Sequence, residues 1–256
     1  MRQIDLNADL GESFGAWRMG DDAGVMPWIT SANVACGFHA GDPAIMRQTV
    51  ALCVRHGVAL GAHPSFPDLQ GFGRREMRVS PDEAYAHTLY QIGALQAFAN
   101  AAGTRLRHVK PHGALYNMAA RERALADAIA HAVRDFDRGL VLVGLAGGAL
   151  IEAGRALGLA VSREGFCDRR YRADGSLTPR SEPHAVIEDR DQAMAQAVAI
   201  ATRQQAATAD GAIVPVEADT LCVHGDRPDA ARFAEGLRRA LQEAGVQVVA
   251  GPPRAC

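Results

Sequence analysis

Short segments rich in apolar and β-branched residues alternate with longer helical patterns about six times along this chain of 256 residues. Repeated succession of strand, helix and strand predicts a parallel sheet with helices packed outside it. We expect the strands at Gln3–Ala8, Ser31–Cys36, Val58–His63, Leu106–Lys110, Leu140–Leu145, Ala160–Glu164 and Thr220–His224.

Helix-boundary signals support this alternation. Ser80 stands where an N-cap belongs, with Pro81 at the first helical position and two acids after it. Glycines close four of the helical patterns, where a C′ residue belongs. No linker or repeat divides the chain, so one domain over residues 1–256 is expected. The helices are expected at Asp42–His56, Ser80–Ala102, Arg121–Phe136, Gly148–Leu157, Asp189–Ala207 and Asp229–Ala244.

The first expected strand carries three polar side chains on one face. Alternation places Asp5, Asn7 and Asp9 together, opposite a row of apolar side chains. Central strands of an open α/β sheet are apolar on both faces, whereas a barrel lumen gives such side chains a polar interior. With seven expected strands, the α/β pattern predicts an irregular seven-stranded (β/α) TIM-like barrel.

Composition excludes several classes of partner. Basic and acidic residues nearly cancel, at 27 against 29, and no run of five like charges occurs, so neither a nucleic acid nor an anionic membrane is expected. No stretch approaches 18 uninterrupted apolar residues, and the first residues lack an apolar signal segment. Five cysteines without a C-x-x-C pair argue against a disulfide framework and a zinc ribbon. We therefore expect a cytoplasmic protein.

Polar residues beside glycine or proline occupy the expected strand ends, where barrels of this type place their active sites. Lys110 is the most informative of them, because it is the only lysine among 27 basic residues. A lysine kept in an arginine-rich chain indicates a need for a compact ammonium with a tunable pKa. The convergence of several such residues predicts one polar active site at the barrel mouth.

The strand-end residues are assigned to two sets. Asp9 is the best general-base candidate, and Lys110 could be a charge clamp or a proton donor between carboxylates. The asparagines suit an amide or carboxylate, and the arginines suit a carboxylate or phosphate. Structural bracing remains the alternative for Asp9 and the histidines, and a solvated loop for the arginines. The catalytic candidates are Asp9, Lys110, His63 and Glu164, and the substrate-binding candidates are Asn7, Asn33, His39, His112, Arg169, Arg170 and His224.

Metal and nucleotide motifs are weak in this sequence. Asp9, His39 and His63 would make a plausible facial set of metal ligands, but no H-E-x-x-H or paired-cysteine motif is present. A protein-bound metal is therefore not firmly predicted. No G-x-x-x-x-G-K-[ST] motif occurs either, so no local pattern indicates ATP.

Seven motifs distributed over nearly the whole chain, in order, resemble the LamB/YcsF family. The resemblance implies an irregular barrel similar to the glycoside hydrolase/deacetylase group. It also implies that the protein is the A subunit of an ATP-dependent enzyme that cleaves 5-oxo-L-proline to L-glutamate, with ADP and phosphate released. Implied with it are ATP with Mg²⁺ as its counter-ion and two partner subunits, B and C. The motifs are Asp5–Gly15, Ser31–Pro43, Gly61–Pro67, Gly71–Arg75, Val109–Asn117, Glu164–Arg180 and Cys222–Asp226.

Two other classes of function remain open at the level of the sequence. The expected fold and the set Asp9, His39 and His63 also suit a metal-dependent deacetylase or amidohydrolase that acts without ATP. A non-catalytic subunit that binds the substrate for its partners is the second alternative, because binding sites and catalytic sites use the same residue types.

Overall fold

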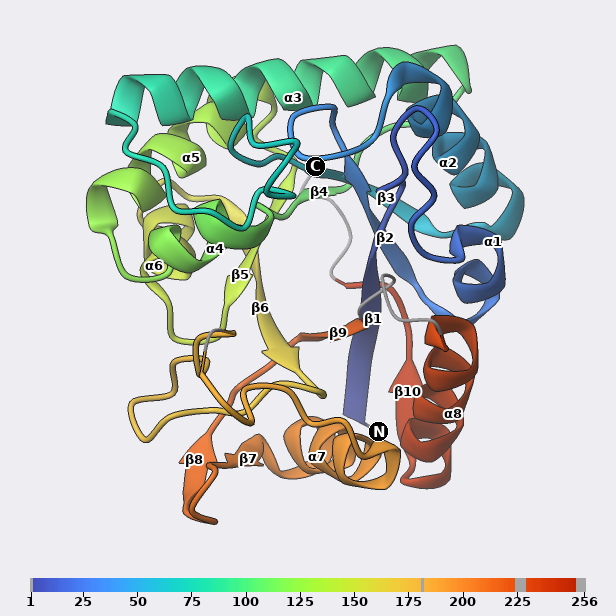
Figure 1. Ribbon diagram of the computed structural model, residues 1–256, viewed down its shortest axis with the longest axis vertical. Coiled ribbons are helices and arrows are strands. Elements are labelled where there is room, and N and C mark those ends of the chain that lie inside the picture. Colours follow the sequence, from blue (N-terminus) through green and yellow to red (C-terminus); the bar gives the residue numbers. More distant parts are fainter. Residues whose placement is uncertain (1, 181, 224–228, 252–256) are drawn as a thin grey trace.

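Seven parallel strands close into a barrel in this computed structural model, which describes residues 2–180, 182–223 and 229–251. The last barrel strand pairs with the first, so the sheet has no open edge there (Figure 1). An extra strand, β10 (Val246–Val248), pairs with the N-terminal end of β1. The barrel strands in order are β1 (Arg2–Leu10), β2 (Ser31–Ala35), β3 (Ala59–His63), β4 (His108–Val109), β5 (Val141–Leu145), β6 (Ala160–Phe166) and β9 (Thr220–Val223).

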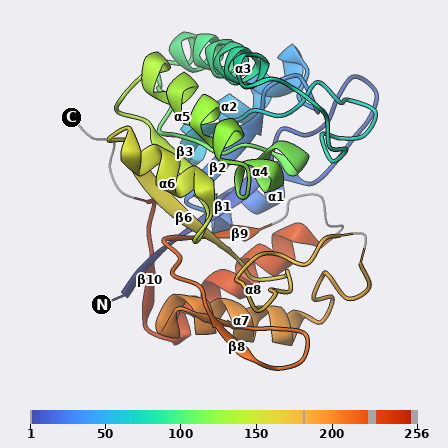
Figure 2. The same cartoon turned by 90° about the vertical axis from the view of Figure 1, so that its left-hand side faces the viewer.

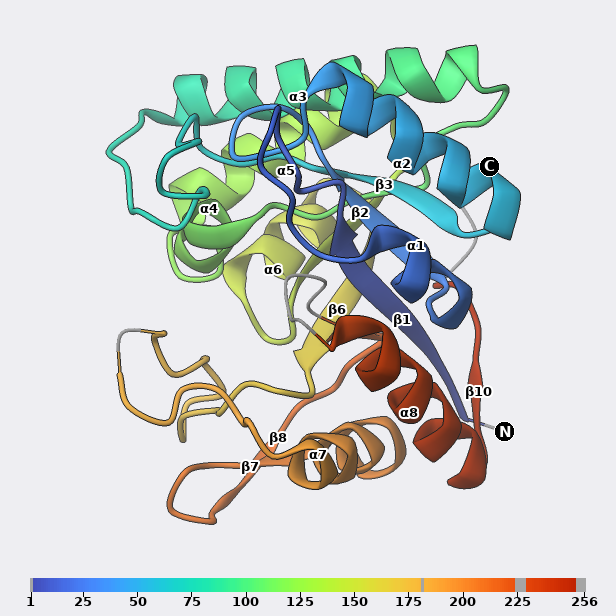
Figure 3. The ribbon, with the colours of Figure 1, turned by 45° about the vertical axis from the view of Figure 1, so that its right-hand side comes forward.

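Helices surround the barrel. Figures 1 and 2 show the long α3 on one side, packed on α5, and α7 with α8 together on the opposite side. Figure 3 shows α2 beside β2 and β3, with the short α1 below it. The helices are α1 (Asp22–Val25), α2 (Pro43–His56), α3 (Pro81–Ala101), α4 (Gly113–Ala119), α5 (Arg123–Phe136), α6 (Ala149–Ala156), α7 (Arg190–Arg203) and α8 (Ala230–Glu243), with a 3₁₀ turn at Met26–Trp28.

Local chemistry explains where helices begin and end. Ser80 caps the start of α3, as the sequence predicted, and Glu83 bonds back to it to complete a reciprocal capping box. The expected helix Asp189–Ala207 is wrong in its last residues. Gln204 turns the backbone left-handed with φ 55°, and the chain continues as β7 (Gln205–Ala207), which pairs with β8 (Ile213–Pro215). The backbone pairing of that hairpin overrides the helical preference of its alanines.

The polar face of β1 points into the barrel lumen. Asp5 accepts hydrogen bonds from Ser31 Oγ at 2.7 Å and Thr220 Oγ1 at 2.5 Å, on the two neighbouring strands. Burial raises the pKa of Asp5 above its usual value despite these donors. A cavity of about 30 Å³, room for about one water, lies beside it. The barrel expected from this polar face is confirmed.

The buried apolar side chains of strands and helices form one hydrophobic core, which includes Ile4 on β1 and Leu241 on α8. Across the described ranges, no helix has both the length and the apolar character that a membrane crossing requires.

Candidate active site

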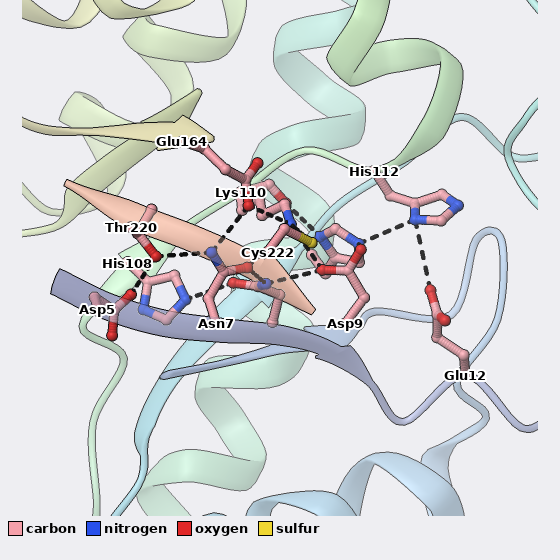
Figure 4. Close-up of polar contacts among 12 residues, drawn as sticks. Asp5, Asn7, Asp9, Glu12, His108, Lys110, His112, Glu164, Thr220 and Cys222 are labelled. Carbon is pink, nitrogen blue, oxygen red and sulfur yellow. Dashed lines mark hydrogen bonds and ion pairs between the residues drawn. The ribbon is translucent and has the colours of Figure 1, made fainter. Parts of the chain in front are cut away.

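The ammonium of Lys110 lies at the centre of a buried polar network, just after β4 (Figure 4). Its Nζ is 2.9 Å from Asp9 Oδ1 and 2.7 Å from Glu164 Oε1. It also donates to Asn7 Oδ1 at 3.1 Å and contacts Cys222 Sγ at 3.3 Å. Strands β1, β6 and β9 thus supply the partners of one cation at the end of β4.

Electrostatics hold this cluster in its charged form. Burial alone would lower the pKa of Lys110, but Asp9, Cys222 and Glu164 outweigh it and hold that pKa well above its usual value. Burial would raise the pKa of Asp9, but His63 and Lys110 outweigh it, so the pKa is well below the usual range. Lys110 therefore serves as a fixed positive charge rather than as a neutral amine.

Two asparagines orient the carboxylates around Lys110. Asn7 Nδ2 donates to Glu164 Oε1 at 2.9 Å and to Thr220 Oγ1 at 2.8 Å. Asn33 Nδ2 donates to Asp9 Oδ1 at 2.8 Å and to Asn7 Oδ1 at 2.7 Å. The strand register explains this, because Asp9 pairs with Asn33 across β1 and β2. Both amides are engaged by neighbouring side chains, so in this structure they position the carboxylates.

His108 is hydrogen-bonded to the same polar network. Its Nε2 donates to Asn33 Oδ1 at 2.7 Å, and burial lowers the pKa of His108 to about 3, so the ring is neutral. Gly61 on the neighbouring strand makes room for it, since a Cβ there would lie 2.1 Å from His108 Nε2.

Three histidines and a glutamate form a second cluster beside Asp9. His63 Nε2 lies 3.3 Å from Asp9 Oδ2 and 3.0 Å from His112 Nδ1. Glu12 Oε1 lies 3.5 Å from His112 Nδ1 and 3.3 Å from His39 Nε2. Burial lowers the pKa of both His39 and His112 well below the usual value. One candidate ligand atom from each of Glu12, His39, His63 and His112 lies within 4.8 Å of the others, an arrangement able to hold a metal.

This cluster differs from the metal set that the sequence suggested. Glu12 takes part and was not singled out, although it stands three residues after Asp9 in the same motif. Glu12 lies in the loop beyond the end of β1, so strand alternation could not predict where its side chain points.

Tyr116 is a second residue that the sequence did not single out. It lies on α4, and its buried hydroxyl has no hydrogen-bond partner among the described residues; the same holds for Glu164 Oε2. Burial and the nearby Glu164 carboxylate raise the pKa of Tyr116 well above its usual value. A neutral phenol donor on Tyr116 thus lies close enough to the Glu164 carboxylate to interact with it.

The predicted arginines lie in the loop after β6. Arg169 is buried and donates to the backbone carbonyls of Thr178, at 2.6 Å, and Ala185, at 3.4 Å; burial lowers its pKa to about 10. Arg170 Nη2 is 3.4 Å from Gln192 Oε1. These contacts tie the loop together and do not join it to Lys110, so substrate binding by the arginines stays a prediction. His224 lies outside the described residues.

Fold and site together define a (β/α)-barrel protein with an ammonium, carboxylates and imidazoles gathered at the C-terminal end of the barrel. The LamB/YcsF family model matches residues 4–254, and the chain belongs to that family. This confirms the resemblance that the sequence motifs indicated.

Named relatives are similar over their full length. The chain is 60% identical over 247 residues to a protein of Bordetella pertussis (strain Tohama I) named as the A subunit of 5-oxoprolinase, covering 96% of this chain and 98% of that one. It is 60% identical over 249 residues to the protein of the same name from Methylococcus capsulatus (strain Bath), covering 97% and 96%. The crystal structure of a lactam utilization protein from Thermus thermophilus matches with a TM-score of 0.91 and 51% identity, covering 97% of this chain and 99% of that one.

Proposed function

We propose that this chain is the barrel subunit of an ATP-dependent 5-oxoprolinase, which cleaves 5-oxo-L-proline to L-glutamate and releases ADP and phosphate. The supporting observation is full-length similarity to proteins named as the A subunit of 5-oxoprolinase, in a chain whose barrel mouth holds Lys110 between Asp9 and Glu164. The proposal includes partner subunits B and C, ATP with Mg²⁺, and a cytoplasmic location, where ATP is available.

The chemistry explains the need for ATP. The lactam is an unreactive amide, and phosphorylation of its carbonyl oxygen by ATP would release ADP and make the carbonyl carbon electrophilic. Two waters are then consumed. The first adds to that carbon and the ring C–N bond breaks, which frees the amine and leaves an acyl phosphate; the second hydrolyses the acyl phosphate, which releases phosphate and leaves the second carboxylate of glutamate. No nucleotide motif in this sequence assigns the ATP site to this chain.

Each group of the network receives a role in this proposal. Among the carboxylates Asp9, Glu12 and Glu164, Asp9 is the most exposed, with 13% of its side chain exposed. In this proposal Asp9 is therefore the carboxylate that meets the attacking water. Because its pKa is low, Asp9 orients the water better than it removes a proton from it. Lys110 supplies the fixed charge that stabilises oxygen anions.

The two unsatisfied groups fit the lactam itself. Glu164 Oε2 is an acceptor suited to the lactam N–H, and the Tyr116 hydroxyl is a donor suited to its carbonyl oxygen. Ligands commonly engage such buried groups, because leaving them unpaired is costly. Arg169 and Arg170 stay candidates for the substrate carboxylate.

The test is glutamate and ADP formation from 5-oxoproline and ATP by the partner subunits, with and without this chain. We expect both products in equal amounts, and only when this chain is present. Absence of coupled turnover with authentic partners and Mg²⁺ would overturn the proposal.

One observation favours a second candidate, a metal-dependent hydrolase of a small amide that acts without ATP. The observation is the cluster of Glu12, His39, His63 and His112. Turnover of 5-oxoproline or of an N-acetylated amide by the chain alone, with Zn²⁺ and without ATP, would favour this candidate.

A further inference from the structure

We propose that Glu12, His63 and His112 hold one divalent transition-metal ion of the Zn²⁺ class at the barrel mouth, with His39 orienting Glu12. The proposal goes beyond the cleavage of 5-oxoproline and does not depend on it, because it concerns what this chain binds by itself.

Hydrogen bonds to backbone carbonyls define which ring nitrogen bears hydrogen in His63 and in His112. His63 Nδ1 lies 2.7 Å from the Lys110 carbonyl oxygen, and His112 Nε2 lies 2.9 Å from the Phe72 carbonyl oxygen. A carbonyl only accepts, so both of these nitrogens bear hydrogen. A histidine that binds a metal is neutral, and in that form the remaining nitrogens, His63 Nε2 and His112 Nδ1, present lone pairs.

These two lone-pair nitrogens are only 3.0 Å apart, and the ring planes meet at 81°. Both rings are buried, with 1% and 5% of each residue exposed. Two lone pairs facing each other in a buried site repel unless a cation or a shared proton lies between them. Backbone acceptors on the far nitrogens are also the usual arrangement that orients metal-binding histidines.

Carboxylates complete the cluster. Glu12 Oε1 is 3.5 Å from His112 Nδ1, and Asp9 Oδ2 is 3.3 Å from His63 Nε2. Ligands about 2.0–2.1 Å from a tetrahedral ion are separated by about 3.3–3.5 Å. Two of the three separations among the proposed ligands, 3.0 Å and 3.5 Å, are therefore close to what such an ion requires, and the third is within 4.8 Å, with Asp9 beside His63.

The charge balance points the same way. Asp9, Glu12 and Glu164 place three carboxylates near the single buried ammonium of Lys110, an excess of negative charge when all are ionised. Arg74, an exposed cation over the ring of Phe72, also acts on His39 and His112 and offsets part of this excess. A divalent cation would offset the excess and allow an anionic substrate to approach.

His39 is assigned a supporting role by its ring geometry. It stacks on His112 with centroids 3.9 Å apart and an angle of 5°. Parallel rings direct their lone pairs side by side, so both rings cannot aim at one ion without tilting. His39 Nε2 instead lies 3.3 Å from Glu12 Oε1, where an N–H orients the carboxylate.

Two neutral imidazoles and one carboxylate select the class of ion. Nitrogen ligands favour Zn²⁺ and its first-row neighbours over Mg²⁺ and Ca²⁺, which prefer oxygen. Three protein ligands leave a position open, as in catalytic rather than structural zinc sites. Such an ion polarises a bound carbonyl or lowers the pKa of bound water.

The test is Zn²⁺ binding by the full chain, measured by competition with a chromophoric chelator, with Co²⁺ absorption as a report on coordination. We expect one ion per chain and no comparable competition from Mg²⁺. The isosteric Glu12→Gln and the variant His112→Ala should weaken binding at least about 100-fold, and His39→Ala by about 10–100-fold.

His131→Gln is the control, because His131 is a half-buried histidine on α5 whose Nδ1 lies 2.7 Å from the Asp127 carbonyl oxygen and which takes no part in the barrel network. Its Zn²⁺ affinity should stay within about twofold, with folding of every variant checked by circular dichroism. Absence of Zn²⁺ and Co²⁺ binding tighter than micromolar would overturn the proposal and leave a shared proton between His63 and His112. Unchanged affinity in both Glu12→Gln and His112→Ala would overturn it as well. Because no substrate or partner is present, failure here is distinct from failure of coupled turnover.

Discussion

At the scale of single residues, the interior of the barrel contains several ionisable groups. Burial normally disfavours the charged form of such groups. Lys110 and Asp9 keep their charges because each has the other within 2.9 Å. His108, by contrast, has no carboxylate among its described hydrogen-bond partners and stays neutral. The same degree of burial therefore has opposite consequences, depending on the partner.

His108 makes stability depend on pH in a direction that can be worked out. Its folded-state pKa, about 3, is below the unfolded value of about 6.5, so only the unfolded state takes up this proton between those values. Its contribution to stability is present above pH 6.5 and falls with acid, by up to about 1.4 kcal/mol per pH unit.

Urea unfolding of the wild type and His108→Gln between pH 7 and pH 4 measures this contribution. Glutamine keeps a donor for Asn33 Oδ1 but does not titrate. We expect a shallower loss of stability in His108→Gln, and parallel curves for the two proteins would contradict the assignment.

Residues on the first strand could be predicted well, because alternation fixes which side chains share a face. This is why Asp9, Asn7 and the polar lumen followed from the sequence. Glu12 and Tyr116 could not be predicted as site residues, because they lie on a loop and on a short helix whose direction depends on packing. Arg169 was a candidate as a basic residue just after an expected strand, and its carbonyl partners come from a loop fold that the sequence does not reveal.

At the scale of elements, the loop between β3 and α3 packs tightly against the start of α4. Gly73 O accepts from Ala114 N at 2.8 Å, and a Cβ on Gly113 would lie 2.4 Å from that same oxygen. Gly73 has φ +64°, and a Cβ on it would lie 2.2 Å from Ser65 Oγ and 2.9 Å from His112 Cδ2. Glycine at this position lets the loop lie directly against the histidine cluster.

Replacing Gly73 by alanine should therefore combine backbone strain with a clash. The left-handed conformation alone costs about 1–2 kcal/mol for a residue with a Cβ. Gly57→Ala is the matched control, since Gly57 has φ +66° but no atom within 4 Å of its Cβ position. Chemical unfolding should show a loss larger by at least about 1 kcal/mol for Gly73→Ala. Equal losses would show that the loop yields without cost.

Strand and helix positions were confirmed where periodicity was long. All seven expected barrel strands and six expected helices are present, with shifted ends. The short elements β7, β8, β10 and α4 were not expected, because three to seven residues carry too little pattern to separate them from a loop. The strand expected at Leu106–Lys110 is reduced to His108–Val109, and Pro111, which has no N–H to donate to a neighbouring strand, follows Lys110.

At the scale of the whole molecule, barrel closure creates the site. Partners of Lys110 come from residues 7, 9, 164 and 222, and only the pairing of β9 with β1 brings the last of these next to the first. Closure was predictable from the polar face of β1, whereas the contacts across the lumen required the register of every strand. The single domain over residues 1–256 stays a prediction.

The central claim is that this barrel mouth takes part in the reaction, and turnover by the Lys110→Met variant tests it most directly. Methionine keeps the volume but leaves Asp9 and Glu164 without their common cation, so the rate of ATP-coupled glutamate formation with partner subunits should fall at least about 100-fold. Asp9→Asn should act in the same direction. Arg123→Met is the control, since that arginine is 53% exposed and, among the residues the structure describes, its ion pair is with Asp127 on its own helix.

Thermal unfolding identifies any variant that fails to fold, and the isosteric Asp9→Asn keeps the test decisive if Lys110→Met does not fold. The account predicts folded variants with strongly reduced turnover beside a fully active Arg123→Met enzyme. Near wild-type turnover in folded Lys110→Met and Asp9→Asn enzymes would contradict it, and would make this chain a non-catalytic subunit that serves the chemistry of its partners.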